Sequence, residues 1–292
     1  MQDNARRETE RILDNMIARL TEIYTDAQPN VQKAADEFFQ NFAALDKQKQ
    51  VQVDKGIITE KEYEDWRTNK ILYSQRFKHM TQQYAEELLH VNETAIDYVN
   101  EQLPEIYALN YNEFAKQAEY YGGMSFSLVD ADTVRTLAET DGSLLPYKKL
   151  DPNVDVPWNM RKVNSEVLQG ILTGESIPKI ADRMAKVTNA NRVGAVRTAR
   201  TLVTGAENHG RWDGIRRMEA NGIIVEKEWL ATFDKRTRDS HAALNGETAA
   251  VDVPFSNGLL YPGDPNGAPS EVYNCRCTML TNVKGFKPRS KK

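Results

Sequence analysis

Apolar residues recur every three or four positions along the first 120 residues, which is the spacing of one face of an amphipathic helix. The first apolar stripe consists of Ile12, Leu13, Met16, Ile17, Leu20, Ile23 and Tyr24. The second stripe consists of Val31, Ala35, Phe38, Phe39 and Phe42. Residues 26–30, from Asp26 to Asn30, separate the two stripes, and Gly56 follows the second. The pattern therefore predicts two helices that end at these interruptions.

A third helix is predicted to begin at Thr59, because Thr59 and Glu62 have the spacing of a capping box. It should end near Asn100, since Pro104 cannot donate a helical hydrogen bond. Such a helix has about 40 residues and is about 60 Å long. Its apolar positions have the spacing of a bundle or coiled-coil seam: Trp66, Tyr73, Phe77, Met80, Tyr84, Leu88, Val91, Ala95 and Tyr98. This length suits a protein that spans a distance or packs against neighbouring subunits, and an ordinary helical bundle fits the spacing equally well.

The middle of the chain has little periodicity. Residues 124–157 contain three prolines and predict a linker with one short helix over 131–140. Helical patterning returns over 158–172, and Ser176 is a candidate N-cap ahead of Pro178. A further, arginine-rich helix is predicted over 190–220.

The pattern changes after residue 222. Residues 225–233 alternate with Val225, Trp229, Ala231 and Phe233 on one side, as in a half-buried strand. The following residues are rich in Asn-Gly and Pro-Gly turns. The predicted fold is a mainly α N-terminal helical region with long helices, followed by a small α+β C-terminal module. The predicted divisions are a long-helix bundle or arm over 1–123, a linker over 124–157, a second helical part over 158–222, the α+β module over 223–283 and a basic tail over 284–292.

Composition narrows the function only modestly. With 40% hydrophobic and 27% charged residues the chain can build a core, and its net charge of −4 carries no whole-chain signature of nucleic-acid binding. The basic tail is the exception: it either stays solvated or contacts DNA through Lys284, Lys287, Arg289, Lys291 and Lys292. The first residues do not have the pattern of a signal peptide, and no apolar stretch reaches the ~18 residues of a membrane span, so we expect no membrane association.

Cys275 and Cys277 are the two cysteines of the chain. Their number excludes a disulfide framework and fits a reducing compartment. In a strand both sulfurs point to one side, and with His241 they offer three zinc ligands. A structural zinc site normally has four ligands, and the fourth candidates are Asp234, Glu271 and His209. The alternative is a buried histidine beside two unliganded core cysteines.

Catalytic motifs are weaker. A cysteine nucleophile with His241 as base is conceivable, but no spacing places them together. Asn208-His209 resembles a fragment of a metal-dependent nuclease site. Phosphate-cradling glycine loops, a Gly-x-Ser-x-Gly elbow and a His-Glu-x-x-His helix do not occur. We therefore predict a protein that is not an enzyme, with a metal-dependent hydrolase as the alternative.

The ordered run of motifs over residues 160–280 resembles the Mu F-like phage head morphogenesis domain, found in the minor head (minor capsid) proteins of tailed bacteriophages. The motifs are residues 228–241, Leu244-Asn245-Gly246, Pro254-Phe255, residues 261–265 and Asn274-Cys275-Arg276-Cys277, with residues 197–201 upstream. The residues of this signature that we single out are Trp229, Asp234, Arg236, Thr237, Arg238, Gly246, Asn274 and Arg276.

The resemblance implies a structural virion protein that acts in head morphogenesis. It implies association with the portal protein, with scaffold or major capsid protein as further partners, and a role in DNA packaging or delivery. The location implied is the host cytoplasm during assembly and then the capsid interior or portal vertex. A metal-dependent nuclease and a DNA-binding internal virion protein remain the alternatives.

The resemblance also bears on the metal. Many relatives carry cysteines where Arg238 and His241 stand, and a histidine just before the Cys-x-Cys, and these were suspected to bind metal. This chain keeps His241, Cys275 and Cys277 but has Glu271 and Val272 near the last position. Zinc is therefore one expectation. The other is that Arg238 replaces the charge of the metal by pairing with Glu271, with the fold held by a core around Trp229 and Phe233.

Overall fold

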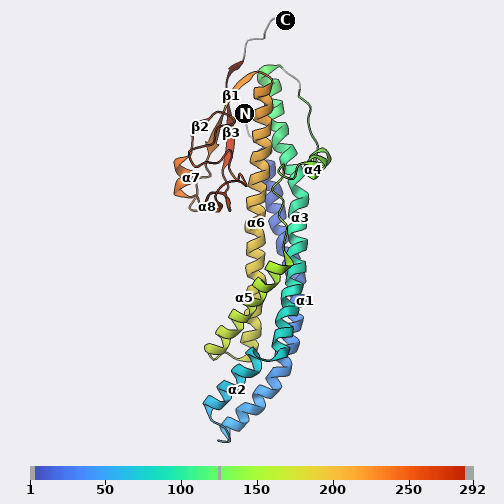
Figure 1. Cartoon of the computed structure of the whole chain (residues 1–292), viewed down its shortest axis with the longest axis vertical. Coiled ribbons are helices and arrows are strands. Elements are labelled where there is room, and N and C mark those ends of the chain that lie inside the picture. Colours follow the sequence, from blue (N-terminus) through green and yellow to red (C-terminus); the bar gives the residue numbers. More distant parts are fainter. Residues whose placement is uncertain (1–3, 124–125, 287–292) are drawn as a thin grey trace. The chain divides into compact units, whose positions relative to one another are not determined.

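The computed structural model describes residues 4–123 and 126–286 of the chain. Six helices come first: α1 (Asn4–Asp54), α2 (Glu60–Leu72), α3 (Gln75–Gly122), α4 (Ala131–Thr140), α5 (Pro152–Leu172) and α6 (Ile177–Ala220) (Figure 1). They are followed by β1 (Ile223–Leu230), α7 (Asp239–Ala243), β2 (Thr248–Ala249), α8 (Pro269–Val272) and β3 (Thr278–Phe286). The predicted fold class, long N-terminal helices before a small α+β region, is confirmed. Among the described residues no helix is long and apolar enough to cross a membrane.

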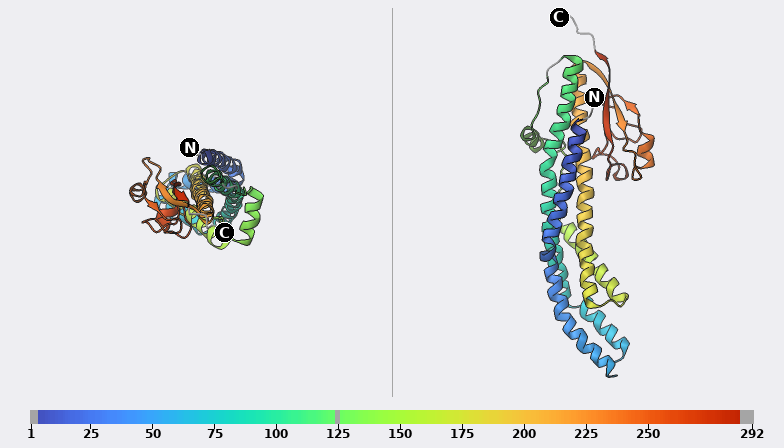
Figure 2. Two further views of the ribbon diagram at one scale, coloured as in Figure 1. Left: turned by 90° about the horizontal axis from the view of Figure 1, so that it is seen from above. Right: turned by 180° about the vertical axis from the view of Figure 1, so that it is seen from behind.

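Contacts group the chain into two compact units, each built from separated segments. Unit 1 comprises Met1–Ala18, Ile96–Lys148 and Val196–Lys292, and unit 2 comprises Arg19–Ala95 and Lys149–Ala195. Helices α1, α3 and α6 each contribute residues to both units. In unit 1 the start of α1 lies beside α3, and in unit 2 the chain turns back from the end of α1 into α2 (Figure 2). The division of the chain at residues 123, 157, 222 and 283 stays a prediction.

Two predicted helix ends are wrong. Helix α1 runs straight through residues 26–30 with Pro29 inside it, and α3 contains Pro104. A proline removes one hydrogen bond from a helix, but buried apolar residues lie in phase on both sides of each. Tyr24 and Val31 are seven positions apart and both buried, and Leu103 and Ile106 flank Pro104 with no exposed surface. Packing of a continuous stripe therefore outweighs the local cost.

The predicted helix over 59–100 is two helices. The Thr59 capping box is confirmed: the Glu62 N–H donates to Thr59 Oγ1 at 3.2 Å, and the Thr59 N–H donates to Glu62 Oε2 at 2.8 Å. The helix then ends at Leu72, and Ser74 Oγ accepts from the Phe77 N–H at the start of α3. Tyr73, expected in the seam, lies at this break and is 72% exposed.

The elements between residues 124 and 222 are closer to expectation. Helix α4 has the predicted bounds, with Asp130 accepting from the Thr133 N–H. Helix α5 begins at Pro152, earlier than predicted, because Asp151 caps it. Helix α6 begins directly after Ser176 and is unbroken to Ala220, so the helix predicted from residue 190 is its second half.

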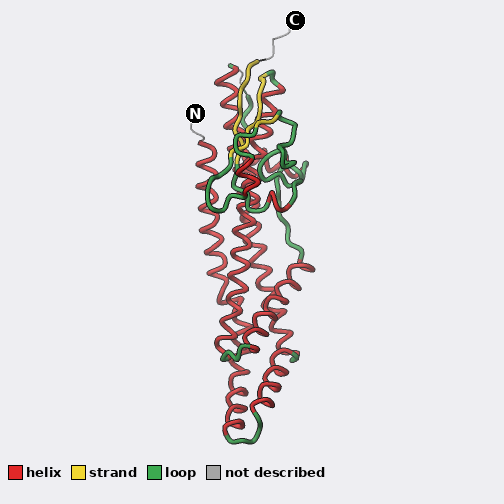
Figure 3. Tube along the Cα trace, turned by 90° about the vertical axis from the view of Figure 1, so that its left-hand side faces the viewer, coloured by secondary structure: helices red, strands yellow, loops and turns green. Residues whose placement is uncertain are grey.

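The three-stranded antiparallel sheet has the order β2-β1-β3, with Trp229 opposite Met279 (Figure 3). Trp229 and Met279 are fully buried and share a core with Phe255 and with residues of α3 and α6. The predicted strand over 225–233 begins and ends earlier. Phe233 lies beyond β1 and is 70% exposed, so its expected place in the core is wrong.

Helices α3 and α6 approach closely in unit 1 because glycines occupy the contact. A Cβ on Gly210 would lie 2.5 Å from the carbonyl oxygen of Tyr107, and a Cβ on Gly214 would lie 2.7 Å from Phe114 Cβ. Beside them, fully buried Arg211 donates to Asn110 Oδ1 of α3 at 2.9 Å and to the Met279 carbonyl of β3 at 3.1 Å. One buried guanidinium thus ties the sheet to both helices.

Candidate metal centre

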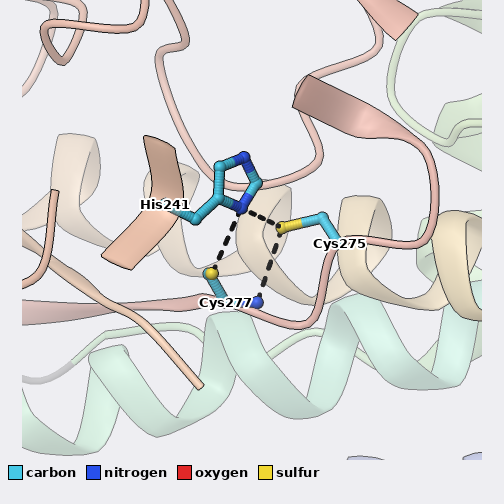
Figure 4. A group of neighbouring side chains, drawn as sticks. All are labelled: His241, Cys275 and Cys277. Carbon is cyan, nitrogen blue, oxygen red and sulfur yellow. Dashed lines mark hydrogen bonds between the residues drawn. The ribbon is translucent and has the colours of Figure 1, made fainter. Parts of the chain in front are cut away.

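His241, Cys275 and Cys277 meet in the C-terminal module. His241 Nδ1 lies 3.6 Å from Cys275 Sγ and 3.4 Å from Cys277 Sγ (Figure 4). All three residues are buried, and their ligand atoms lie within 4.8 Å of one another. The expectation that the two sulfurs of the Cys-x-Cys segment face one side agrees with this arrangement.

The imidazole is held by its surroundings. His241 lies on the short helix α7, and its ring packs edge-on against Trp229 with centroids 5.2 Å apart. Its Nε2 lies 3.0 Å from Glu271 Oε2 of α8. Because a carboxylate only accepts hydrogen bonds, this contact places the ring proton on Nε2 and turns the Nδ1 lone pair toward the sulfurs.

The cysteine segment is fixed to α6 by its backbone. Thr204 Oγ1 donates to the Cys275 carbonyl at 2.7 Å, and Asn208 Nδ2 donates to the Cys277 carbonyl at 3.2 Å. Asn274, just before the segment, has φ of 56°, a left-handed conformation that asparagine tolerates better than most residues. Its N–H donates to Thr201 Oγ1 at 2.8 Å. The two sulfurs are therefore presented by a backbone with little freedom.

Arg276 joins two loops. Its guanidinium pairs with both oxygens of Asp234. Asp234 also accepts from the Arg236 N–H at 2.8 Å and so caps the turn that follows β1. These donors, Arg276 first, hold the pKa of Asp234 well below its usual range. Asp234 is thereby committed to Arg276.

The spacing of the three ligand atoms fits a tetrahedral ion. With Zn–S near 2.3 Å and Zn–N near 2.0–2.1 Å, nitrogen and sulfur on one tetrahedral zinc lie about 3.6 Å apart. The observed nitrogen–sulfur distances of 3.6 and 3.4 Å match this value. The Glu271–His241 contact is also the outer hydrogen bond that orients metal-ligating histidines. The three residues fit zinc in both donor type and spacing.

A fourth protein ligand is not found within the described residues, where the ligand group consists of these three. Asp234 pairs with Arg276, and His209 Nε2 lies 3.5 Å from Asp213 while its ring stacks on Tyr261. Glu271 contacts the Nε2 side of the imidazole. His241, Cys275 and Cys277 are thus the ligands that the described part of the chain offers to an ion.

The expected Arg238–Glu271 pair is not formed. Arg238 caps the start of α7 and donates to the Tyr273 carbonyl oxygen. Glu271 contacts His241, with Ser240 Oγ at 3.4 Å. The reason is the position of α8, which brings the carboxylate to the buried ring and only a backbone carbonyl to Arg238.

The thiols and His241 are close enough for proton transfer, which the sequence could not indicate. Hydrogen bonding from Cys275 lowers the pKa of Cys277 to about 4, and the same contact raises the pKa of Cys275. Both cysteines are at most 3% exposed, which is unfavourable for a nucleophile that must reach a substrate.

The side chains of Asn208 and His209, the fragment that resembled a nuclease site, face different neighbours. Asn208 is buried against β3, and His209 stacks on Tyr261.

Residues 161–280 match the family model described as Phage Mu protein F like protein. We refer to this segment as the Mu F-like domain, after the family model that it matches. It contains the whole ligand group and all eight residues singled out as its signature, as the resemblance predicted. The family resemblance read from the sequence is therefore confirmed.

Two curated relatives extend the likeness beyond the Mu F-like domain. The minor head protein GP7 of Bacillus phage SPP1 is 29% identical over 203 residues, covering 67% of this chain and 64% of the relative. An Enterococcus faecalis protein named NAD(+)–arginine ADP-ribosyltransferase EFV is 31% identical over 195 residues, covering 61% of this chain and 39% of the relative. The chain thus spans less than two thirds of either relative. No solved structure gives a significant match.

The sequence did not assign a structural role to some residues that support the Mu F-like domain. Glu207, Asn208 and Arg211 form the buried network between α6 and β3, including a 2.7 Å bond from Thr278 Oγ1 to Glu207. Their helical spacing was visible, but charged residues on an arginine-rich helix gave no signal of burial. Of the predicted DNA-contacting tail, Lys284 pairs with Glu226 at 3.1 Å, and Lys287, Arg289, Lys291 and Lys292 lie outside the described residues.

Proposed function

We propose that this chain is a portal-associated minor head protein that acts in procapsid assembly and DNA delivery. The observation that carries the proposal is the Mu F-like domain at residues 161–280, together with the likeness to the SPP1 minor head protein. We propose the capsid interior or portal vertex as its location, with portal protein as the main partner and scaffold or major capsid protein as further partners.

Exposed apolar surface on unit 2 supports a partner-binding role. A groove of about 800 Å³ lies among α1, α2 and the start of α3, and its lining contains the apolar residues Phe38, Phe42, Leu45 and Met80 beside polar ones such as Glu37. Leu45 is 45% exposed at its edge. Stable protein interfaces bury about 1,200–2,000 Å² and place apolar residues at their centre. We propose that portal or scaffold protein covers this surface.

The first test is quantitative mass spectrometry of purified particles and DNA-free procapsids of the source phage, calibrated against portal protein. We expect the chain in both at a low and constant ratio to portal. Co-expression with portal should give a complex on size exclusion, weakened by Leu45→Glu but not by Glu64→Gln, a change at an exposed position of α2. Absence of the chain from both kinds of particle would refute the assignment.

A metal centre is the second part of the proposal, favoured by the nitrogen–sulfur distances at His241, Cys275 and Cys277. Zinc there would join α7 to the segment before β3 and stabilise the fold. We expect about one zinc per chain by elemental mass spectrometry, lost in Cys275→Ser and Cys277→Ser and kept in His90→Ala, a change of an exposed histidine on α3. Metal-free wild-type protein that keeps its full thermal stability would count against the site.

We propose a structural and not a catalytic role. The enzymatic name of the enterococcal relative belongs to a protein of which the aligned part is 39%. Two assays test the alternatives: transfer of labelled ADP-ribose from NAD⁺ to an arginine acceptor, and nicking of plasmid DNA by zinc-loaded protein. We expect neither activity. Turnover that survives purification and disappears in His241→Ala would replace the structural role by a metal-dependent enzyme.

A further inference from the structure

Strand β3 forms one edge of the sheet, because the strand order is β2-β1-β3. Along an antiparallel strand the backbone N–H and C=O groups of successive residues point to alternate sides. Met279 turns both groups away from β1: its N–H donates to Asn208 Oδ1 at 3.0 Å, and its carbonyl accepts from Arg211 at 3.1 Å. By the same alternation, Thr281 and Val283 also turn their backbone groups away from β1.

Side chains of α6 cover the start of this edge and the segment that leads into it, by donating to every second carbonyl. The donors are Thr204, Asn208 and Arg211, and the acceptors are the carbonyls of Cys275, Cys277 and Met279. The next position of α6 in this series is Ile215, which is fully buried and has no side-chain donor. The cover that α6 provides therefore ends before Thr281.

An open groove of about 460 Å³ lies beside the uncovered part of the edge. Residues 281–284 of β3 line it together with Gln117 of α3, and both elements belong to unit 1 at these positions. Residues 281–283 and Gln117 are half-buried. Within residues 4–123 and 126–286, the Gln117 amide has no hydrogen bond and the buried Thr281 Oγ1 has no partner. Polar groups sheltered from water without partners cost free energy, so this groove favours a ligand that can bond them.

We propose that the β3 edge at residues 281–283 binds an extended segment of another protein of the phage particle as a fourth strand. The outward N–H and C=O groups repeat at every second residue, which is the pattern that an extended backbone can pair with. The added strand would lie about 4.8 Å from β3, on the side where the groove is open. That the segment comes from a protein of the particle rests on the proposed function.

A second copy of this chain fits the edge less well. Two β3 edges could pair only from residue 281 onward, because α6 covers the edge before it. Stable interfaces between folded proteins bury about 1,200–2,000 Å², and so short a contact supplies little of that area. Strand addition by a single segment works through the backbone of a few residues. The short open edge therefore favours a segment over a second folded copy.

The test is fluorescence anisotropy with the full-length protein and labelled, overlapping 12-residue peptides that cover the proteins of the purified particle. We expect one or a few of these peptides to bind. Thr281→Pro removes the outward N–H but no hydrogen bond between β1 and β3, so it should weaken this binding about tenfold. Thr281→Val keeps the N–H and the branched shape of the side chain, and it should bind like the wild type.

N-methylation of the bound peptide separates strand addition from recognition of side chains alone. Methyl groups on every second amide should abolish binding in one phase and leave most of it in the other, because alternate N–H groups of a strand face opposite sides. Equal loss in both phases, equal binding by Thr281→Pro and Thr281→Val, or no binding by any peptide would overturn the proposal. A wild-type dimer that Thr281→Pro dissociates would assign the edge to a second copy instead.

Thermal melting checks that each variant is folded. If Thr281→Pro does not fold, Gln117→Tyr gives the same comparison by filling the groove. Lys116→Tyr, at the neighbouring exposed position of α3, is then the control that should bind like the wild type. The mass spectrometry of particles does not depend on this edge, so a failure here would leave the minor head assignment in place.

Discussion

Lys227 shows how a single residue can make stability depend on pH. Its ammonium group is buried on β1, donates to the carbonyls of Val251 at 2.9 Å and Leu260 at 2.7 Å, and lies 5.0 Å from the Phe255 ring centroid. Burial lowers its pKa to about 8, from 10.5. Between these values the unfolded chain binds more protons than the folded chain, so stability from this group rises as pH rises.

The predicted consequence is a difference between wild type and Lys227→Met. Raising the pH from 7.5 to 10 should stabilise the wild type relative to the variant, by at most about 3 kcal/mol at ~1.4 kcal/mol per pKa unit. Urea unfolding at the two pH values measures the free energy of unfolding of each protein. Groups that titrate in both proteins contribute equally, so their effect cancels in the difference. Equal pH dependence in the two proteins would show that Lys227 is not desolvated in the fold.

Glu271 is a positioning residue for the proposed metal centre, since it contacts His241 Nε2 and not the sulfurs. Losing such an outer hydrogen bond typically lowers metal affinity 10- to 100-fold. We expect Glu271→Gln to do so in a chelator competition, with Cys275 and Cys277 still giving the cobalt–thiolate absorption band. Glu64→Gln serves as the control. An unchanged metal affinity would show that Glu271 does not position His241 for the metal. It would also weaken the assignment of His241 as a ligand.

At this scale the sequence predicted part of the site. The two-residue spacing of the cysteines was enough to place their sulfurs on one side. The predicted pairing of Arg238 with Glu271 was wrong. The sequence does not show that α8 places the Glu271 carboxylate beside His241. The prediction that Phe233 belongs to the core was also wrong. The alternating pattern would place it on the buried side of a strand, but β1 ends at Leu230, before Phe233.

Among the elements, the contact of α3 with α6 depends on Gly210 and Gly214. Adding a methyl group at either position would force the helices apart, which typically costs about 1–3 kcal/mol. Gly194 on the same helix has open space around its Cβ position, so alanine there should be neutral or stabilise by up to ~1 kcal/mol through helix propensity. We therefore expect Gly210→Ala and Gly214→Ala to lower stability in chemical denaturation and Gly194→Ala not to. Equal effects at the three sites would contradict the close approach.

Helix boundaries show where local patterns stop being informative. The capping box at Thr59 marks a real helix start, because it depends on two residues that are three apart. The interruption at residues 26–30 and Pro104 were given too much weight, since in-phase buried residues on both sides of each keep α1 and α3 unbroken. The break at Tyr73 could not be read, because its aromatic ring fits the apolar stripe although it is exposed.

The segment that matches the family model, residues 161–280, lacks parts of unit 1 that complete its core. A fragment of residues 158–286 contains the sheet and α6 but lacks Phe114 and Ala118 of the shared core and Asn110, the partner of Arg211. We expect this fragment to bind a hydrophobic dye and to melt without a sharp transition, while the full chain melts cooperatively. A cooperative transition near that of the full chain would show that α3 is dispensable.

The discontinuous make-up of unit 1 also fixes an order of events during synthesis. Its first segment ends at Ala18, and its last begins at Val196. At roughly 5–20 residues per second, the ribosome needs about 10 to 40 seconds to add the intervening chain. During that time the last segment of unit 1 has not been made. The apolar residues at the start of α1, such as Ile12 and Met16, therefore lack part of the unit that they belong to. A nascent-chain chaperone that shields this stripe should therefore raise the yield of folded protein, and slowing translation should lower it.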